Sequence, residues 1–144
     1  GGDPERWREI LDVNVIALAT CTSLAVDDMR RRGDAGHVVH VSSLSGHRVT
    51  RGGAMYAASK HAVRAMTEGL RGELRALASG IRVTAISPGN VATDFVARVF
   101  ADYEPPPYPI LEAKDVADAV AHVLAAPDHV AYHDLLMRPA QQVT

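Results

Sequence analysis

The sequence has one cysteine, Cys21, in 144 residues, so no disulfide bond can form within the chain. We expect Cys21, which lies in an apolar run, to be a small core residue in a reducing, cytoplasmic compartment. The formal net charge of −2 gives no general attraction to nucleic acid or to an anionic membrane. We find neither a predicted membrane span nor the cationic and apolar segments of a signal peptide. With 47% hydrophobic and 22% charged residues, the composition is that of an ordinary globular domain.

Hydrophobic periodicity predicts alternating helices and strands. The first helix begins at Asp3-Pro4 and ends at Gly33, since Asp caps helices, Pro suits the first turn and Gly ends them. The predicted helices cover residues 4–32, 54–78 and 112–125, and the predicted strands cover residues 37–41, 81–86 and 134–137. This order favours an α/β fold with parallel strands, although three strands are few for such a sheet and leave a bare hydrophobic edge.

The most informative local pattern is Tyr56-Ala57-Ala58-Ser59-Lys60 in the second predicted helix. Residues four apart lie on one face of a helix, so the Tyr56 phenol and the Lys60 ammonium point into the same space. A nearby ammonium favours the phenolate, and we therefore expect the pKa of Tyr56 to be lowered. Such a phenol can donate a proton to a carbonyl or accept one from an alcohol. A surface pair on an amphipathic helix has the same spacing, so both interpretations stay open on this pattern alone.

Two polar residues lie where a ligand or a buried partner is expected. Ser43 follows the strand 37–41, and open α/β sheets bind ligands at the carboxyl ends of their strands. Its hydroxyl can donate to a carbonyl oxygen, although a capping or turn serine gives the same pattern. Asn14 interrupts an apolar helix, where it either faces solvent or is buried and needs hydrogen-bond partners.

The segment Ser87-Pro88-Gly89-Asn90-Val91-Ala92-Thr93 follows the strand 81–86. Proline fixes the turn there, and glycine lets backbone approach a ligand closely. The backbone of Val91 and the hydroxyl of Thr93 are candidates to bind a carboxamide, with a plain turn as the alternative.

Together, these four patterns resemble the short-chain dehydrogenase/reductase family. That family has an Asn in the helix before its fifth strand, a Ser after that strand, Tyr-x-x-x-Lys on the next helix and Pro-Gly after the sixth strand. The resemblance covers essentially the whole chain and implies a three-layer, Rossmann-like parallel sheet flanked by helices. Residues 45–49 (Ser-Gly-His-Arg-Val) and the ending 137–144 resemble more particularly the cytosolic carbonyl and steroid reductases of the family.

The resemblance also implies a role for each candidate residue. Tyr56 is the general acid/base, Lys60 binds the nicotinamide ribose and lowers the Tyr56 pKa, and Ser43 polarises the substrate oxygen. Asn14 holds a water that links Lys60 to solvent. The nicotinamide end is contacted by Pro88, Gly89, Val91 and Thr93. Residues 94–109, which carry four prolines, resemble the family's variable substrate lid.

The implied activity is the interconversion of a ketone or aldehyde and an alcohol with NADP, or with NAD as the alternative. The implied partners are a small apolar carbonyl or alcohol substrate and further copies of the full-length protein, as a homodimer or homotetramer. No metal is expected, because the seven histidines form no His-Glu-x-x-His or Cys/His cluster. His47 and His61 flank the predicted site by sequence, and a structural role is favoured for both.

The sequence departs from the family in one large respect. The glycine-rich phosphate loop, G-x-x-x-G-x-G, and the first strands of the family are not found in it. We therefore interpret residues 1–144 as the catalytic carboxyl-terminal half of the domain. We expect the isolated chain to bind a nicotinamide dinucleotide poorly and to be inactive, and micromolar binding in calorimetry would contradict this.

Two other interpretations remain. In the first, the chain is an inactive truncated fragment. In the second, it is a dimerisation module built from its two long helices. A nucleotide-sugar epimerase or dehydratase, which also carries Tyr-x-x-x-Lys, is disfavoured because too few residues follow Lys60 for the substrate domain of those enzymes.

Overall fold

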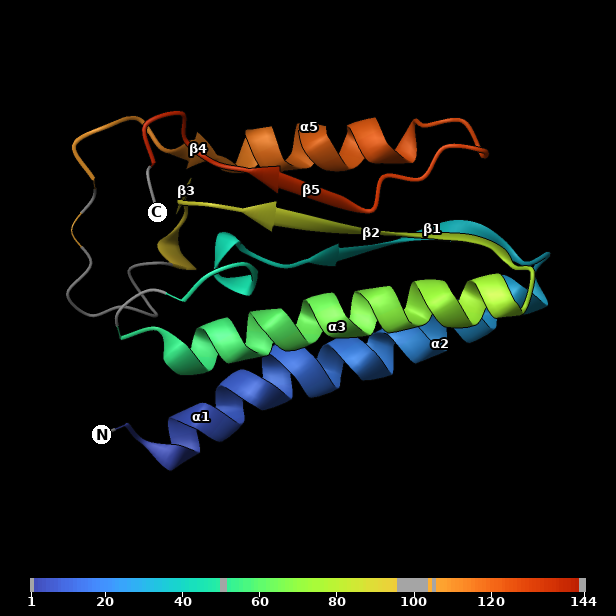
Figure 1. Cartoon of the computed structure of the whole chain (residues 1–144), viewed down its shortest axis with the longest axis horizontal. Coiled ribbons are helices and arrows are strands. Elements are labelled where there is room, and N and C mark those ends of the chain that lie inside the picture. The colour runs from blue at the N-terminus through green and yellow to red at the C-terminus, as the bar shows by residue number, and fades with distance from the viewer. Residues whose placement is uncertain (1, 50–51, 96–103, 105, 143–144) are drawn as a thin grey trace.

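The computed structural model describes residues 2–49, 52–95, 104 and 106–142. A parallel sheet lies between two layers of helices (Figure 1). Helices α2 (Leu18–Arg31) and α3 (Ala54–Ala76) cover one face of the sheet, with α1 (Pro4–Leu11) packed against α3, and α5 (Ala113–Leu124) covers the other face. This layered α/β arrangement confirms the predicted fold class.

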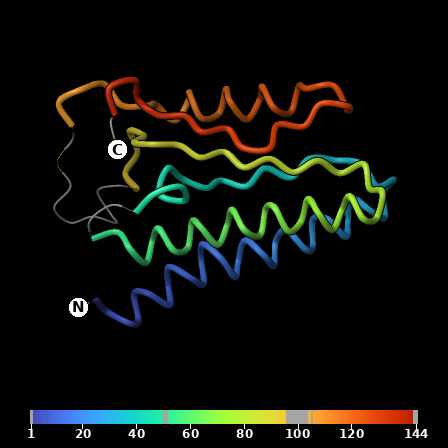
Figure 2. The backbone as a smooth tube through the Cα atoms, in the orientation of Figure 1, coloured from blue at the N-terminus to red at the C-terminus, as the bar shows by residue number. Residues whose placement is uncertain are grey.

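The sheet has the order β1 (Ala35–Val41), β2 (Gly80–Pro88) and β5 (Asp134–Met137), and all neighbouring strands are parallel. The carboxyl ends of the strands lie at the same edge of the sheet as the start of α3 (Figure 2). Each strand was predicted to within a few residues. A second, parallel pair was missed, β3 (Val91–Ala92) with β4 (Leu111–Glu112), because two residues are too short for a periodic signal.

The first helix runs without interruption from Pro4 to Arg31, as predicted, but its middle is more loosely wound. Asp3 caps it by accepting a hydrogen bond from the Glu5 amide at 3.0 Å. Residues Asp12–Ala17 form a π-helical segment between α1 and α2. Gly33 ends the helix with φ +117°, a backbone conformation that favours glycine.

The same helix is long and apolar enough, by length and composition, to cross a membrane. The expectation that the sequence has no such run is therefore wrong by this measure, because residues 13–26 form a stretch without charge. In the structure this stretch packs alongside α3 and β1. The Asn14 amide donates to the Ser59 hydroxyl, and the Thr22 hydroxyl contacts the His40 ring, so polar groups of the stretch meet protein partners.

The core between the sheet and helices α2 and α3 is built from aliphatic residues of three elements, α2, α3 and β2. Its centre is formed by Val26, Leu74, Ile81 and Val83. Cys21, in contrast, is exposed, so its predicted place in the core is wrong. The reason is the rotation of α2: the adjacent Thr22 faces the sheet, and successive helical residues point about 100° apart.

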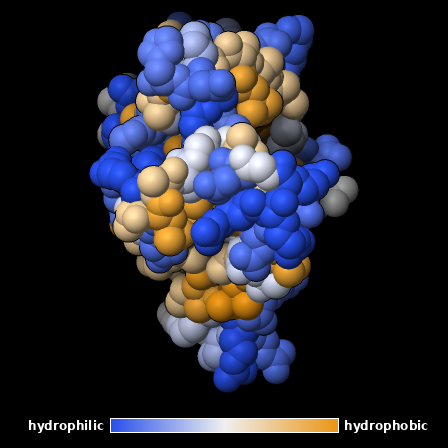
Figure 3. Space-filling model, turned by 90° about the vertical axis from the view of Figure 1, so that its right-hand side faces the viewer, coloured by the Kyte–Doolittle hydropathy of each residue, from blue (hydrophilic) through white to orange (hydrophobic). Residues whose placement is uncertain are grey.

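The end of the molecule opposite the carboxyl ends of the strands is largely covered by hydrophilic residues, with separate apolar patches (Figure 3). Arg82 is tied down there by one guanidinium nitrogen, which donates to the carbonyls of Ala126, Pro127 and Val130. The Arg82 side chain therefore has a structural role at this end. Open α/β sheets bind ligands at the opposite end, where the strands have their carboxyl ends.

A buried histidine lies in the core near the carboxyl end of β1. His40 is only 4% exposed, and its ring nitrogens lie 2.8 Å from Thr67 Oγ1 and 2.9 Å from Thr22 Oγ1. The Thr67 hydroxyl donates to the Val63 carbonyl, so His40 Nδ1 carries the proton and Nε2 accepts from Thr22. Burial, and next the charge of Arg71, lower the pKa of His40 below its ordinary value of 6.5.

Because of His40, we expect the protein to be less stable in mild acid than at neutral pH. Below pH 6.5 the unfolded chain takes up a proton that His40 in the folded chain resists, so we expect the free energy of unfolding to fall as the pH drops through this range. Urea unfolding at pH 7.5 and pH 5.5 measures it. A His40→Gln variant is expected to be less stable at pH 7.5 but less sensitive to acid, whereas the exposed control His129→Gln keeps the wild-type dependence. Equal acid sensitivity in all three proteins would show that His40 does not contribute.

Candidate active site

Tyr56 and Lys60 lie on one face of α3, in its first turns. The Lys60 Nζ atom is 5.7 Å from the centre of the Tyr56 ring. The same Nζ donates a hydrogen bond of 3.1 Å to the carbonyl of Val41, the last residue of β1. The pair is thereby fixed at the carboxyl edge of the sheet, where the sequence predicted a site.

Ser43 is brought to the same place by the turn that follows β1. This turn is a single 3-10 turn, η2 (Leu44–Gly46), and the Ser43 hydroxyl caps it by accepting from the Ser45 amide at 3.1 Å. The same side chain hydrogen-bonds to Tyr56, an interaction that lowers the tyrosine pKa and so favours the phenolate. The capping role that the sequence offered is therefore present, the hydrogen bond to the phenol adds to it, and the donation to a substrate oxygen stays a prediction.

The direction of the Tyr56 pKa differs from the expectation. Burial raises the pKa of Tyr56, and the hydrogen bond from Ser43 opposes this without reversing it. Burial also lowers the pKa of Lys60. The expectation considered only the charge of Lys60, but the amine is directed at the Val41 carbonyl and both side chains lose solvent. The neutral phenol is therefore the form that this environment favours.

Asn14 reaches this site from the π-helical segment of the first helix. Its Nδ2 donates to Ser59 Oγ at 3.1 Å, and that hydroxyl donates to the Tyr56 carbonyl at 2.7 Å. Asn14 thus supports the turn of α3 that separates Tyr56 from Lys60, and π-helical segments often occur at functional sites. Its predicted water remains a prediction. Ser59, which the structure buries fully, was missed as a partner of Asn14, although the pattern contains this serine between Tyr56 and Lys60.

The predicted cofactor segment begins where β2 ends at Pro88. The Gly89 amide donates to the Met137 carbonyl at 2.8 Å, and the Asn90 amide donates to the Gln142 side-chain oxygen at 3.0 Å. A Cβ on Gly89 would lie 2.3 Å from that oxygen. The close approach that this glycine permits is therefore to Gln142, a buried residue near the end of the chain that the sequence analysis did not single out.

The rest of this segment leads towards Tyr56. Val91 is half-buried in β3, and Thr93 is exposed. Two residues later, the Phe95 ring centre lies 6.1 Å from that of Tyr56. Of the predicted lid, residues 96–103 and 105 lie outside the described residues. Within the described ranges, no group of three or more His, Cys, Asp or Glu side chains could hold a metal ion.

Known protein families and curated proteins match most of this chain. The family model for short chain dehydrogenase matches residues 2–104. The chain is 44% identical to "Dehydrogenase/reductase SDR family member 11" of Bos taurus over 99% of its length, and 41% identical to "Farnesol dehydrogenase" of Aedes aegypti over 92%. It spans 60% and 54% of these two relatives, respectively.

Solved structures give the same result. The closed form of serine dehydrogenase complexed with NADP+ superposes with a TM-score of 0.89 at 30% identity, covering 99% of this chain and 59% of that one. The serine dehydrogenase of Escherichia coli has a TM-score of 0.83 at 30% identity, with 99% and 57% coverage. Asn14, Ser43, Tyr56 and Lys60 lie within residues 2–104, the range that the family model matches.

Proposed function

The chain belongs to the short-chain dehydrogenase/reductase family, and from this premise we propose that it carries the catalytic half of an NADP-dependent oxidoreductase, with NAD as the alternative cofactor. The proposed reaction interconverts a ketone or aldehyde and an alcohol. The observation that carries the proposal is the contact of Ser43 with Tyr56 beside Lys60, at the carboxyl edge of the sheet. In this reaction Tyr56 is the general acid/base.

The chemistry of Lys60 suits the ribose of a nicotinamide nucleotide. Its amine has three donors, of which one is used by the Val41 carbonyl, and within the described ranges no carboxylate pairs with it. A half-buried amine of this kind is stabilised by ribose hydroxyls, and the backbone of residues 88–93 is proposed to bind the carboxamide. When bound, the nicotinamide supplies or accepts the hydride.

The proton is proposed to move at the Tyr56 hydroxyl. Because burial keeps this phenol protonated, it can donate to the oxygen of a carbonyl substrate as negative charge develops there. The Ser43 hydroxyl, which faces the phenol, stabilises the same charge as a second donor. In the direction of alcohol oxidation, the phenolate accepts the proton, and the hydrogen bond from Ser43 helps to form it.

The proposed substrate is a small apolar carbonyl or alcohol compound, because the Phe95 ring beside Tyr56 offers an apolar contact. The proposed setting is the cytoplasm and a homodimer or homotetramer of the full-length protein. A second candidate function is a dimerisation module without activity. It is favoured by exposed apolar residues of the first helix: Val13, Ile16 and Leu24.

A single assay separates these two functions. The full-length protein that contains this chain is incubated with NADPH and a small apolar diketone, and the absorbance of NADPH is followed while the molecular mass is measured by sedimentation. Oxidation of NADPH that depends on the diketone supports the proposed oxidoreductase. A dimer that leaves NADPH unchanged supports the second candidate.

A further inference from the structure

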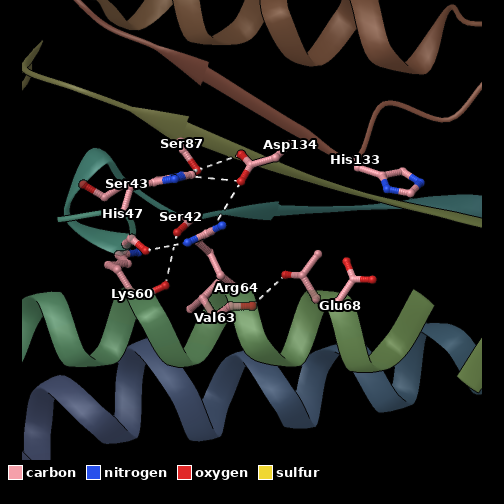
Figure 4. Close-up of polar contacts among 12 residues, drawn as sticks. Ser42, Ser43, His47, Lys60, Val63, Arg64, Glu68, Ser87, His133 and Asp134 are labelled. Atoms are coloured by element: carbon pink, nitrogen blue, oxygen red, sulfur yellow. Dashed lines mark hydrogen bonds and ion pairs between the residues drawn. The ribbon is translucent and has the colours of Figure 1, made fainter. Parts of the chain in front are cut away.

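A cluster of polar side chains lies directly behind the turn that carries Ser43 (Figure 4). His47 Nε2 is 3.1 Å from Ser87 Oγ and 3.4 Å from Asp134 Oδ2. Ser87 Oγ is 3.1 Å from Asp134 Oδ1, and Arg64 Nε is 3.4 Å from Asp134 Oδ2. The four residues come from the turn after β1, the end of β2, the start of β5 and α3, so the cluster joins four of the elements that border the site.

The hydrogen-bond directions in this cluster are determined by chemistry. The Asp134 carboxylate can only accept, so the Ser87 hydroxyl gives its one proton to Asp134. His47 Nε2 must then be the donor to Ser87, which makes it the protonated nitrogen of the ring. Burial, and next the positive charge of Arg64, lower the pKa of His47, against the opposing effect of Asp134. The ring is therefore neutral at neutral pH, with its proton on Nε2.

The geometry argues against a Ser-His-Asp nucleophile. In such a triad the histidine accepts the serine proton, whereas here that proton goes to Asp134. Ser87 is also fully buried, with an exposed fraction of 0%, so no substrate reaches it. The cluster is built to hold elements together.

His47 and Ser43 are the two ends of the same 3-10 turn, since Ser43 caps its start and His47 its end. The turn lies against α3 at Gly46, where a Cβ would be 2.9 Å from the Lys60 carbonyl oxygen. Arg64, one helical turn after Lys60, donates to the Gly46 carbonyl at 3.0 Å. The turn is thus fastened to α3 on one side, and His47 is its link to the sheet on the other.

We propose that His47 is a positioning residue of this site, whose Nε2–H bond to Ser87, beside Asp134, holds the turn so that the Ser43 hydroxyl meets Tyr56. The catalytic importance of this role rests on the proposed function. Whether the Ser43–Tyr56 contact depends on the N–H donor of His47 can be measured without turnover.

The test uses the titration of the Tyr56 phenol in the full chain, followed by NMR with tyrosine labelled with ¹³C at Cζ. Since the hydrogen bond from Ser43 lowers the Tyr56 pKa, its loss in His47→Leu is expected to move the titration to higher pH. His47→Gln keeps an N–H donor at about the reach of Nε2 and is expected to titrate like the wild type. The control is His129→Leu, at an exposed position after α5. Should His47→Leu not fold, Ser87→Ala removes the acceptor instead and is expected to give the same upward shift.

Turnover provides the second readout. If NADPH is oxidised, His47→Leu is expected to lower kcat by about 5–10-fold, as for the loss of one hydrogen bond, with an unchanged KM for NADPH and rescue by His47→Gln. A Tyr56 titration that is the same in the wild type and His47→Leu, or equally shifted in His47→Leu and His47→Gln, overturns the positioning role even where turnover is present. A shift that His47→Gln rescues, together with no turnover by the full-length protein, supports the positioning role and refutes the proposed function.

Discussion

A Tyr56→Phe variant is expected to lose about 10²–10⁴-fold in kcat for carbonyl reduction, the contribution that a positioned general acid makes. The ring and its contact with Phe95 remain, and only the hydroxyl that meets Ser43 is removed. The binding of NADPH is therefore expected to change little. Steady-state kinetics with a diketone, together with the quenching of protein fluorescence by NADPH, measure both quantities.

Tyr132→Phe is the matched control for this variant. The Tyr132 hydroxyl contacts His122 Nε2 at 3.0 Å on the far side of the sheet, so its loss is expected to leave kcat unchanged. If Tyr56→Phe keeps more than a tenth of the wild-type kcat, the assignment of the general acid is wrong. Because the Tyr56 pKa is raised, reduction by the wild type is expected to persist into alkaline solution and to fall as the phenol ionises.

The sequence was sufficient for those features that depend on local spacing. Tyr56 and Lys60 share a face of α3 because any residues four apart in a helix do, and the three strands were visible as β-branched runs between helices. The positions of the helices and strands along the chain were therefore predictable. The exposure of Cys21 was not predictable, since the hydrophobicity of neighbouring residues does not determine which side of a helix faces the sheet.

Features that depend on contacts between distant segments could not be predicted. The direction of the Tyr56 pKa depends on how much solvent the folded chain removes from the phenol, and the spacing of a lysine does not contain this information. Gln142 and Gly89 are separated by more than fifty residues, as are Asn90 and Gln142, yet they meet at the end of β2. His47 was recognised as flanking the site, but its partners Ser87 and Asp134 come from two other strands.

Two glycine substitutions are expected to change the free energy of unfolding in opposite directions. The first, Gly46→Ala, tests how closely the turn after β1 must lie against α3. A Cβ at Gly46 would be 2.8 Å from Ser42 Oγ and 2.9 Å from the Lys60 carbonyl oxygen, both closer than real Cβ contacts. The Lys60 oxygen belongs to the helix backbone and cannot rotate away. Gly46→Ala is therefore expected to push the turn off α3, lowering the free energy of unfolding by about 1–3 kcal/mol and separating Ser43 from Tyr56.

Gly69→Ala is the matched partner of this substitution, because Gly69 lies on the exposed side of α3 and a Cβ there meets nothing within 4 Å. Alanine is preferred over glycine inside a helix, so we expect a gain of roughly 0.5–1 kcal/mol. Urea unfolding of both variants measures the two effects, and the Tyr56 titration separates loss of the site from loss of stability. Since the Ser43 hydrogen bond requires the turn to touch α3 at Gly46, Gly46→Ala should raise the Tyr56 pKa, whereas Gly69→Ala should leave it unchanged. Equal stabilities in the two variants would mean that the turn tolerates displacement, and the close packing at Gly46 would then have no role in presenting Ser43 to the phenol.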